Sequence, residues 1–495
     1  MSFEAFSRFV LQLRDADCDL LHREPVYPQG GFPLPTDFAL HEVEKREALV
    51  LKRIFRRMAV FLLITAIGIG LWLYFIPPNL LRVGSGYAAK VVCSNVFIAD
   101  RDVDDVLFND VQAPGNPLLR LMRVNVDRET QSVDAGLFGR IAPSRAVYQP
   151  GTGCAVVGDN SVIAHSDSHP IAVPESDDRL WPEGEKIESH ESLAALLSDS
   201  RLMGPGMRGV VIVKGGRIIA EAYGDGFSSD TPLLGWSMTK TVNAAIIGRL
   251  VLEGRLSLDE KSLFWGWRDD RRALIRISDL MGMESGLAFN ENYGTVADVT
   301  RMLFLEPDMA RFVESLPLEE EIGSRFTYSS GTSVLLSRIW MDRISSKDEA
   351  LTYPRKAIFE PLGMRSAILE ADAAGTFVGS SYMYATARDW AKFGMFLARD
   401  GVWDGQRLLP EGFVRQMHEA NRSSGGRYSK MQTWLPRPDA DLPADAFVLS
   451  GHDGQNIFVI PSLDLVIVRL GLTPRSMGYE AIDLASAVVR QLGPE

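Results

Sequence analysis

A serine three residues before a lysine marks the segment GWSMTKTV (235–242), where a polar stretch passes into a helix-like one. Residues i and i+3 lie on one helical face, so Ser237 and Lys240 can approach each other. A serine hydroxyl is a weak nucleophile that needs a neighbouring base. Lysine can be that base where burial, or the positive potential at a helix start, lowers its pKa. The pair therefore predicts nucleophilic catalysis, and the simpler alternative is that Ser237 only caps a helix.

Two later segments carry further polar groups in comparable settings. FTYSSGTS (326–333) presents Tyr328, followed by Ser329 and Ser330, at a turn before an expected helix. GHDGQ (451–455) stands immediately before a run that has the composition of a strand. Each of these segments has a structural explanation of its own, such as a core tyrosine or a histidine at a strand start. The functional interpretation of both segments depends on their order in the chain after S-x-x-K.

With S-x-x-K, Y-x-S and H-x-G in this order, residues 181–495 resemble the serine hydrolases of the penicillin-binding protein and class C β-lactamase superfamily. The resemblance implies an α/β fold of the β-lactamase/transpeptidase type. In that fold an antiparallel sheet is flanked by helices and carries a helical subdomain. The competing α/β-hydrolase fold needs G-x-S-x-G, and the text around Ser237 lacks the final glycine.

The resemblance also implies a role for each motif residue. Ser237 attacks a carbonyl carbon and forms an acyl-enzyme. Lys240 takes its proton, directly or with Tyr328, whose phenol can pass the proton to the leaving group. Backbone N–H groups of Ser237 and Gln455 are expected to hold the oxyanion. The mechanism requires no metal and no organic cofactor.

The departures from the class C pattern concern substrate binding. Ser330 stands where those β-lactamases have asparagine, and His452 stands where they have lysine, which argues against efficient antibiotic hydrolysis. Both variants look more like the branch that contains 6-aminohexanoate-dimer hydrolase and related esterases and amidases. In its matching loop, here MESGLAFNENYG (283–294), Tyr293 corresponds to a tyrosine that contacts the scissile amide. Tyr293, Ser330, His452 and Gly454 are thus the expected substrate-binding residues, with packing as the alternative for Tyr293 and His452.

The elements that must position these residues follow from hydrophobic pattern and turn chemistry. Gly215-Gly216 separates two β-rich runs and predicts a hairpin with a two-residue turn. The expected elements are hairpins at 209–224 and 456–471 and helices at 191–204, 237–254, 329–340, 386–401 and 478–493. Hairpins at both ends with helices between them predict a mainly antiparallel sheet, helices against it and a largely helical insertion.

One apolar segment predicts a membrane anchor. Met58 to Ile76 contains no charged residue and is long enough to cross a bilayer as a helix. The basic flank at 52–57 places the N-terminus in the cytoplasm and the bulk of the chain outside. A cleaved signal peptide fits poorly because its basic region would be about fifty residues long, and a buried core helix would show a polar face. We expect a single-pass protein of a bacterial inner membrane with a periplasmic catalytic domain.

The cysteines agree with this topology. Cys18 lies on the expected cytoplasmic side, whereas Cys93 and Cys154 both follow the anchor, where disulfides persist. We therefore predict a Cys93–Cys154 disulfide, with two unpaired buried cysteines as the alternative. The expected organisation is a cytoplasmic arm (1–50), an anchor (51–78), a membrane-proximal segment (79–180) and the hydrolase domain (181–495).

Composition excludes several other classes of protein. The 495-residue chain has 46% hydrophobic and 23% charged residues, as folded proteins do, and a net charge of -12 argues against nucleic-acid binding.

HSDSHP (165–170) could hold a metal, but without a third group of ligands it is more often a polar surface loop.

The sequence thus predicts a membrane-anchored serine hydrolase that cleaves a small amide or ester substrate through an acyl-serine. A carboxylesterase, a D-amino-acid peptidase and a weak β-lactamase are the enzyme alternatives. The other alternative is a catalytically silent protein that binds peptidoglycan or a partner. The sequence leaves the oligomeric state open.

Overall fold

The computed structural model describes residues 37–113, 115–158 and 178–493. The chain divides into two compact units, one ending at Leu71 and the other beginning at Trp72. In the first unit the described residues belong to helix α2 (Asp37–Phe75), which runs across the division. Its stretch Ala48–Phe75 contains an 18-residue window with a mean hydropathy of 2.2, and no residue of that window is buried. By length and composition this stretch could cross a membrane as a helix.

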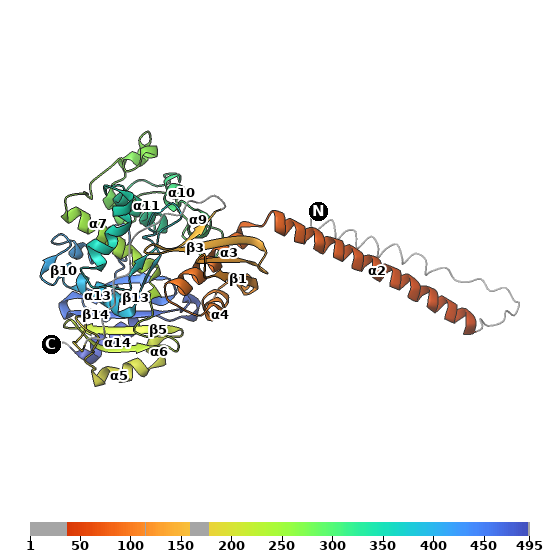
Figure 1. The fold of residues 1–495 in the computed structure, drawn as a ribbon, viewed down its shortest axis with the longest axis horizontal. Coiled ribbons are helices and arrows are strands. Elements are labelled where there is room, and N and C mark those ends of the chain that lie inside the picture. Colours follow the sequence, from red (N-terminus) through yellow and green to blue (C-terminus); the bar gives the residue numbers. More distant parts are fainter. Residues whose placement is uncertain (1–36, 114, 159–177, 494–495) are drawn as a thin grey trace. The chain divides into compact units, whose positions relative to one another are not determined.

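The second unit is built on a five-stranded antiparallel sheet in the order β12-β13-β14-β5-β6 (Figure 1). Its strands are β5 (Met207–Lys214), β6 (Arg217–Tyr223), β12 (Phe447–Gly451), β13 (Gln455–Ile460) and β14 (Leu465–Gly471). Both predicted hairpins are present, and β14 pairs with β5 to join the two hairpins in one sheet. Gly215 and Gly216 have φ of 60° and 79°, which a two-residue turn between such strands requires.

Helices cover both faces of this sheet. Helix α13 (Ala387–Ala398) packs on β13, β14 and β5, whereas α14 (Ile482–Leu492) and α5 (Glu191–Ser198) lie on the opposite side (Figure 1). Val211 and Val213 of β5 enter the larger core with α13, while Val210 and Ile212 enter the core with α14. This alternation is the two-residue period of a strand buried on both faces.

Between the hairpins, the chain forms the expected helical insertion and a small three-stranded sheet. Its elements are α7 (Thr239–Leu252), α8 (Ile277–Met281), α9 (Asp298–Leu305), α10 (Met309–Glu314), α11 (Ser330–Met341), α12 (Lys347–Pro354), β7 (Leu233–Leu234), β8 (Ile368–Leu369), β9 (Met383–Ala385), β10 (Val402–Trp403) and β11 (Gln406–Arg407). The predicted fold class is therefore confirmed.

One predicted helix is wrong in detail. The segment 191–204 is not a single helix but two, α5 and α6 (Ser200–Met203), separated at Asp199. The backbone of Asp199 is extended, with φ of -76° and ψ of 105°, and its carboxylate accepts a hydrogen bond from the backbone N–H of Arg201. The side chain therefore caps a new helix in place of continuing the old one.

Residues 79–157, hereafter the extension, form a subdomain of their own within the second unit. Helix α3 (Asn79–Phe97) packs on a four-stranded antiparallel meander in the order β1-β2-β3-β4, and the two share one apolar core. The other elements of the extension are α4 (Val103–Val106), η1 (Leu107–Gln112), η2 (Pro117–Leu121), β1 (Met122–Asp127), β2 (Ser132–Leu137), β3 (Ile141–Gln149) and β4 (Gly153–Val157).

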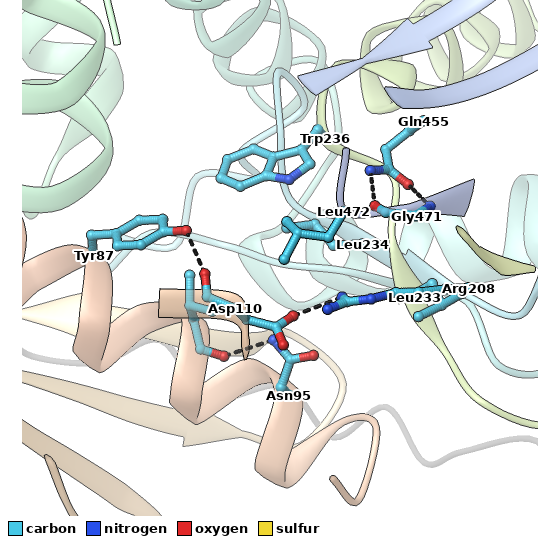
Figure 2. Close-up of a pocket in the computed structure, with 11 residues that line it drawn as sticks. Tyr87, Asn95, Asp110, Arg208, Leu233, Leu234, Trp236, Gln455, Gly471 and Leu472 are labelled. Carbon is cyan, nitrogen blue, oxygen red and sulfur yellow. Dashed lines mark hydrogen bonds and ion pairs between the residues drawn. The ribbon is translucent and has the colours of Figure 1, made fainter. Parts of the chain in front are cut away.

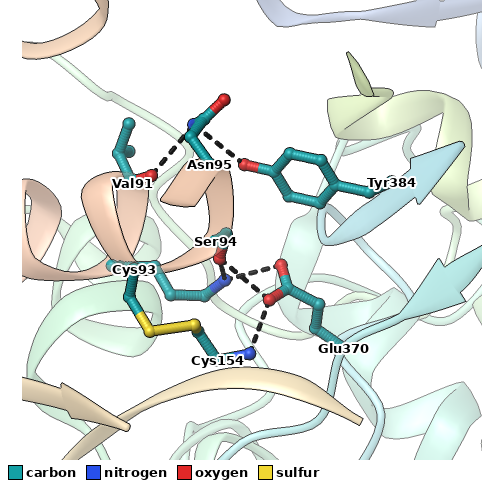
Figure 3. Close-up of a disulfide and its surroundings, with 8 residues drawn as sticks. Val91, Cys93, Ser94, Asn95, Cys154, Glu370 and Tyr384 are labelled. Carbon is teal, nitrogen blue, oxygen red and sulfur yellow. Dashed lines mark hydrogen bonds and ion pairs between the residues drawn. A yellow bond between two sulfur atoms is a disulfide. The ribbon is translucent and has the colours of Figure 1, made fainter. Parts of the chain in front are cut away.

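The extension is tied to the hydrolase region next to a disulfide. Cys93 of α3 and Cys154 of β4 are bonded, which confirms the predicted pair (Figure 3). Beside this bond Glu370, which is fully buried, accepts hydrogen bonds from Lys90 Nζ at 2.6 Å, Ser94 Oγ at 2.9 Å and the Cys154 N–H at 2.7 Å. All three donors belong to the extension, whereas Glu370 directly follows β8 in the hydrolase region.

Candidate active site

The predicted nucleophile lies in a tight turn that precedes a buried helix. A short 3-10 turn, η3 (Trp236–Met238), contains Ser237 and leads into α7. Trp236 has a φ of 47°, a left-handed conformation that costs a residue with a side chain about 1–3 kcal/mol and that collects at functional sites. A hydrogen bond holds this turn against β9, because the Gly235 N–H donates to the Met383 carbonyl at 2.9 Å. The structure thus holds Ser237 rigidly at the start of α7.

Lys240 reaches back from the first turn of α7 to the nucleophile, as the i, i+3 spacing predicts. Its Nζ donates hydrogen bonds to Ser237 Oγ at 3.2 Å, Ser330 Oγ at 3.1 Å and the Ser380 carbonyl at 2.9 Å. The side chain is almost fully buried, and burial lowers its pKa to about 8, while the charge of Glu291 acts in the opposite direction. An amine in that range is free often enough to accept a proton near neutral pH.

Tyr328 lies on the other side of the same amine. Lys240 Nζ is 4.9 Å from the centroid of the Tyr328 ring, and this ring packs against Tyr428 and Trp434, which also contact each other. Burial raises the pKa of the phenol well above its ordinary value, the Glu291 charge adds to the rise, and a side-chain hydrogen bond with Ser237 opposes it. The phenol therefore keeps its proton at neutral pH and can pass it along a hydrogen bond.

Ser330 joins these groups to a carboxylate that the sequence analysis did not single out. The backbone N–H of Ser330 donates to Glu291 Oε2 at 2.8 Å, and its Oγ donates to Glu291 Oε1 at 2.5 Å. Because Ser330 Oγ also accepts from Lys240, a continuous chain runs from the amine through the hydroxyl to the carboxylate. Glu291 lies two residues before Tyr293 in the predicted substrate loop, but no local sequence pattern indicates its contact with Ser330.

A cluster of aromatic rings lies between the predicted nucleophile and the H-x-G motif, His452-Asp453-Gly454. Tyr293 stacks on His452 with ring centroids 5.0 Å apart, and Trp236 meets both rings edge-on at 6.5 Å and 5.6 Å. The side chain of His452 is 45% exposed, and its Nε2 lies 3.4 Å from Asp453 Oδ1. The structure therefore brings the two predicted substrate-binding rings together beside Ser237. Whether they contact substrate stays a prediction.

Gly451, the last residue of β12, allows the H-x-G motif that follows it to lie close to the turn that contains Ser237. A Cβ atom on Gly451 would lie 2.2 Å from the Gly235 carbonyl oxygen, so a side chain here would force β12 away from the nucleophile turn. Gly454 has a φ of 84°, and its carbonyl accepts from Arg469 at 2.9 Å. The oxyanion role of the Ser237 and Gln455 N–H groups and the substrate contact of Gly454 stay predictions.

The side chain of Gln455 is turned away from the substrate side. Its Nε2 donates to the carbonyls of His452 and Asp453 at 3.1 Å each, and its Oε1 accepts from the Gly471 N–H at 2.9 Å (Figure 2). The side chain therefore ties the turn after β12 to the end of β14. Only the backbone N–H of Gln455 is left to serve an oxyanion.

The extension packs directly behind this part of the site. A small cavity of about 30 Å³ separates Trp236 and Gln455 from Tyr87 of α3 and from Asp110 and Arg208 (Figure 2). Tyr87 Oη donates to the Asp110 carbonyl at 3.0 Å, and Arg208 pairs with the Asp110 carboxylate at 2.6 Å. Residues 79–157 are thus part of the support of the nucleophile turn.

The described residues include no group of three or more His, Cys, Asp or Glu side chains that could hold a metal ion. The HSDSHP segment (165–170) lies outside the described residues, as do residues 1–36 of the predicted cytoplasmic arm.

Comparisons with known proteins point in one direction. The family described as Beta-lactamase matches residues 200–487. The 6-aminohexanoate-dimer hydrolase of Paenarthrobacter ureafaciens is 25% identical over 294 residues, which cover 53% of this chain and 72% of that protein. A Bacillus anthracis structure provisionally named for the same hydrolase superimposes with a TM-score of 0.52 at 20% identity, over 62% of this chain and 87% of the other. EstCE1, a hydrolase with promiscuous acyltransferase activity, gives a TM-score of 0.50 at 17% identity, over 60% and 99%.

Proposed function

This chain belongs to the Beta-lactamase family and is a serine hydrolase, and from that premise we propose that Ser237 cleaves a small amide or ester bond through an acyl-enzyme. The family match bears out the resemblance drawn from the three motifs. The observation that carries the proposal is the position of Lys240, a buried amine with a lowered pKa that is hydrogen-bonded to Ser237.

Acylation follows from these contacts. The free amine of Lys240 takes the proton of Ser237 while Oγ forms a bond to the carbonyl carbon of the substrate. The carbonyl oxygen becomes an oxyanion, for which the N–H groups of Ser237 and Gln455 are the proposed donors. When the intermediate collapses, the bond to the leaving amine or alkoxide breaks, and that group receives a proton from Lys240 through the Tyr328 phenol. A water molecule then attacks the acyl-enzyme by the reverse route and restores Ser237.

For the substrate we propose a linear amide or ester in place of a β-lactam. The support is the pair of departures at Ser330 and His452. In the structure Ser330 is engaged with Lys240 and Glu291, and His452 stacks against Tyr293. The relative named for the 6-aminohexanoate dimer supports an amide, and the named esterase-like structure supports the fold alone.

Active-site labelling tests the proposed nucleophile. A fluorophosphonate probe should acylate the wild-type chain and not Ser237→Ala, and mass spectrometry should map the adduct to Ser237. The exposed Ser345 offers a matched control, because Ser345→Ala should label as the wild type does. Labelling that persists in Ser237→Ala would refute the assignment. A panel of p-nitrophenyl esters, linear amides, D-alanyl peptides and nitrocefin then separates the substrate classes.

We further propose that α2 anchors the protein in a bacterial inner membrane, with the N-terminus in the cytoplasm and the catalytic unit in the periplasm. The apolar stretch Ala48–Phe75, the basic flank at 52–57 and the bonded Cys93–Cys154 pair support this orientation. An impermeant protease added to spheroplasts should degrade the catalytic unit. Full protection in intact spheroplasts, with digestion after lysis, would refute the orientation.

A further inference from the structure

A second and much larger cavity opens beside the nucleophile turn. It has a volume of about 510 Å³, and Trp236, Tyr293 and His452 form one of its walls. This volume lies within the range of roughly 300–1,000 Å³ that small-molecule sites occupy. Since Trp236 directly precedes Ser237, a molecule in the cavity would lie next to the reacting atoms. The cavity is therefore continuous with the proposed active site.

The opposite wall is apolar and comes from the extension. It is formed by side chains of α3, of η2 and of the first residue of β1, namely Leu80, Leu81, Val83, Leu118, Leu119 and Met122. These residues precede the region that matches the family, so the wall belongs to this chain's own extension. Gly84 of α3 also lines the cavity, and a Cβ there would lie 2.8 Å from the Met122 methyl carbon, so a side chain at this position would displace Met122.

The chemistry of this wall favours an apolar ligand. Leu80 and Leu118 are 39% and 37% exposed, an unfavourable state for leucines at the mouth of a concave surface unless a ligand covers them. His452, Asp453 and Arg475 supply the charged or ionisable lining, so the leucine wall itself offers no partner for a charged substrate. Burying an alkyl chain there would remove apolar surface of both partners from water.

We propose that this cavity binds a hydrocarbon chain of the substrate, so that the enzyme prefers amphiphilic esters or amides with a long acyl or alkyl group. The inference rests on the proposed acyl-serine mechanism and names the substrate class for that same site. The position of the wall in the chain supports it. Leu80 follows Phe75, the last residue of the apolar helix α2, by five residues, which span at most about 18 Å. Amphiphiles concentrate in membranes, to which the proposed anchor would hold the cavity close.

Chain-length series test the inference. The full-length protein in mild detergent is assayed on p-nitrophenyl acetate, butyrate and octanoate, and on acetate esters of ethanol, butanol and octanol, each below its aggregation limit. Each buried methylene can raise kcat/KM by up to about fourfold. We therefore expect at least a roughly tenfold gain from the shortest to the longest member of one series. The series that shows the gain identifies the acyl or the alkyl group as the occupant.

Two leucines of the same short helix provide the matched variants. Leu118 and Leu121 both belong to η2 and are 37% and 36% exposed, but only Leu118 lines the cavity. Leu118→Asp should lower kcat/KM for the octyl or octanoyl substrate by about fivefold or more, because it places a charge against the chain. The ratio of kcat/KM for the longest to the shortest ester should therefore fall in Leu118→Asp, whereas Leu121→Asp should keep the wild-type ratio.

The outcomes separate this inference from the proposed function. Equal effects of Leu118→Asp and Leu121→Asp on the long substrates, or no gain with chain length in either series, would overturn the cavity assignment while acetate hydrolysis continues. Hydrolysis of the shortest ester that does not depend on Ser237 would instead overturn the proposed function.

Discussion

Replacing Glu291 by glutamine should move the pH dependence of catalysis to lower pH. The Glu291 carboxylate raises the pKa of Lys240, against the larger effect of burial, which lowers it. Glutamine has the same shape and keeps one oxygen, which can accept from the Ser330 N–H while its amide donates to Ser330 Oγ. The substitution therefore removes the charge with little change in packing. Burial, which lowers the pKa of Lys240, is then no longer opposed by the Glu291 charge.

The size of the shift follows from the bridge through Ser330. Its Oγ is 3.1 Å from Lys240 Nζ and 2.5 Å from Glu291 Oε1, so the two charges are about 6 Å apart or less. At that separation opposite charges attract by about 3 kcal/mol in an effective dielectric of about 20. This corresponds to about two pKa units. Because Glu291 is partly exposed, solvent screens some of the attraction, and we expect a shift of about one to two units.

The assay is kcat/KM for an activated ester measured from mildly acidic to alkaline pH. In the wild type the rate should rise with pH as Lys240 loses its proton, with an inflection near 8, because the free amine is the base. In Glu291→Gln the inflection should move down, which raises activity at mildly acidic pH, while the plateau falls because a less basic amine is a weaker base. The exposed Glu319 offers a control, since Glu319→Gln should keep the wild-type profile. An inflection that does not move in Glu291→Gln would refute the electrostatic account of Lys240.

Four further variants test the phenol, the disulfide and the buried ion pair. Tyr328→Phe removes the proton relay and should lower kcat for an amide by about 10²- to 10⁴-fold, with a smaller loss for p-nitrophenyl esters, whose leaving group needs no proton. The double variant Cys93→Ser/Cys154→Ser opens a loop of sequence separation 61 and should cost about 4 kcal/mol, seen as a thermal midpoint lower by about 5 °C. An unchanged midpoint would contradict that estimate. Glu370→Gln leaves the Lys90 charge buried and should destabilise the protein by about 3–5 kcal/mol in the same assay, whereas Lys90→Met/Glu370→Leu should recover most of the loss.

The parts of the fold that could be predicted have local causes. The Gly215-Gly216 turn sets the first hairpin, because only glycine readily adopts two consecutive left-handed conformations. The spacing of Ser237 and Lys240 is fixed by the helix that contains Lys240, and the structure shows the resulting hydrogen bond. Ser329 caps α11 through a hydrogen bond from the Thr332 N–H at 3.0 Å, which places Tyr328 just before a helix as expected.

The parts that could not be predicted depend on contacts between distant segments. Glu291 meets Ser330 from 39 residues away, and no local pattern distinguishes it from other acidic loop residues. The sheet of the extension is likewise held by pairing that its turn-rich sequence signals only weakly. Asp199 could have been recognised, because aspartate is a strong N-cap, but the apolar period on both sides favoured one continuous helix.

The extension supports the proposed active site, although the family match begins only at residue 200. Glu370 is fully buried, and a buried carboxylate is tolerable only when it is paired and hydrogen-bonded. Its hydrogen-bond donors within the described residues come from the extension, where the Cys93–Cys154 bond holds them in place. Glu370 in turn precedes the segment whose Ser380 carbonyl accepts a hydrogen bond from Lys240. The extension therefore supports the segment that contacts Lys240, the proposed base, and it also supplies the apolar wall of the large cavity.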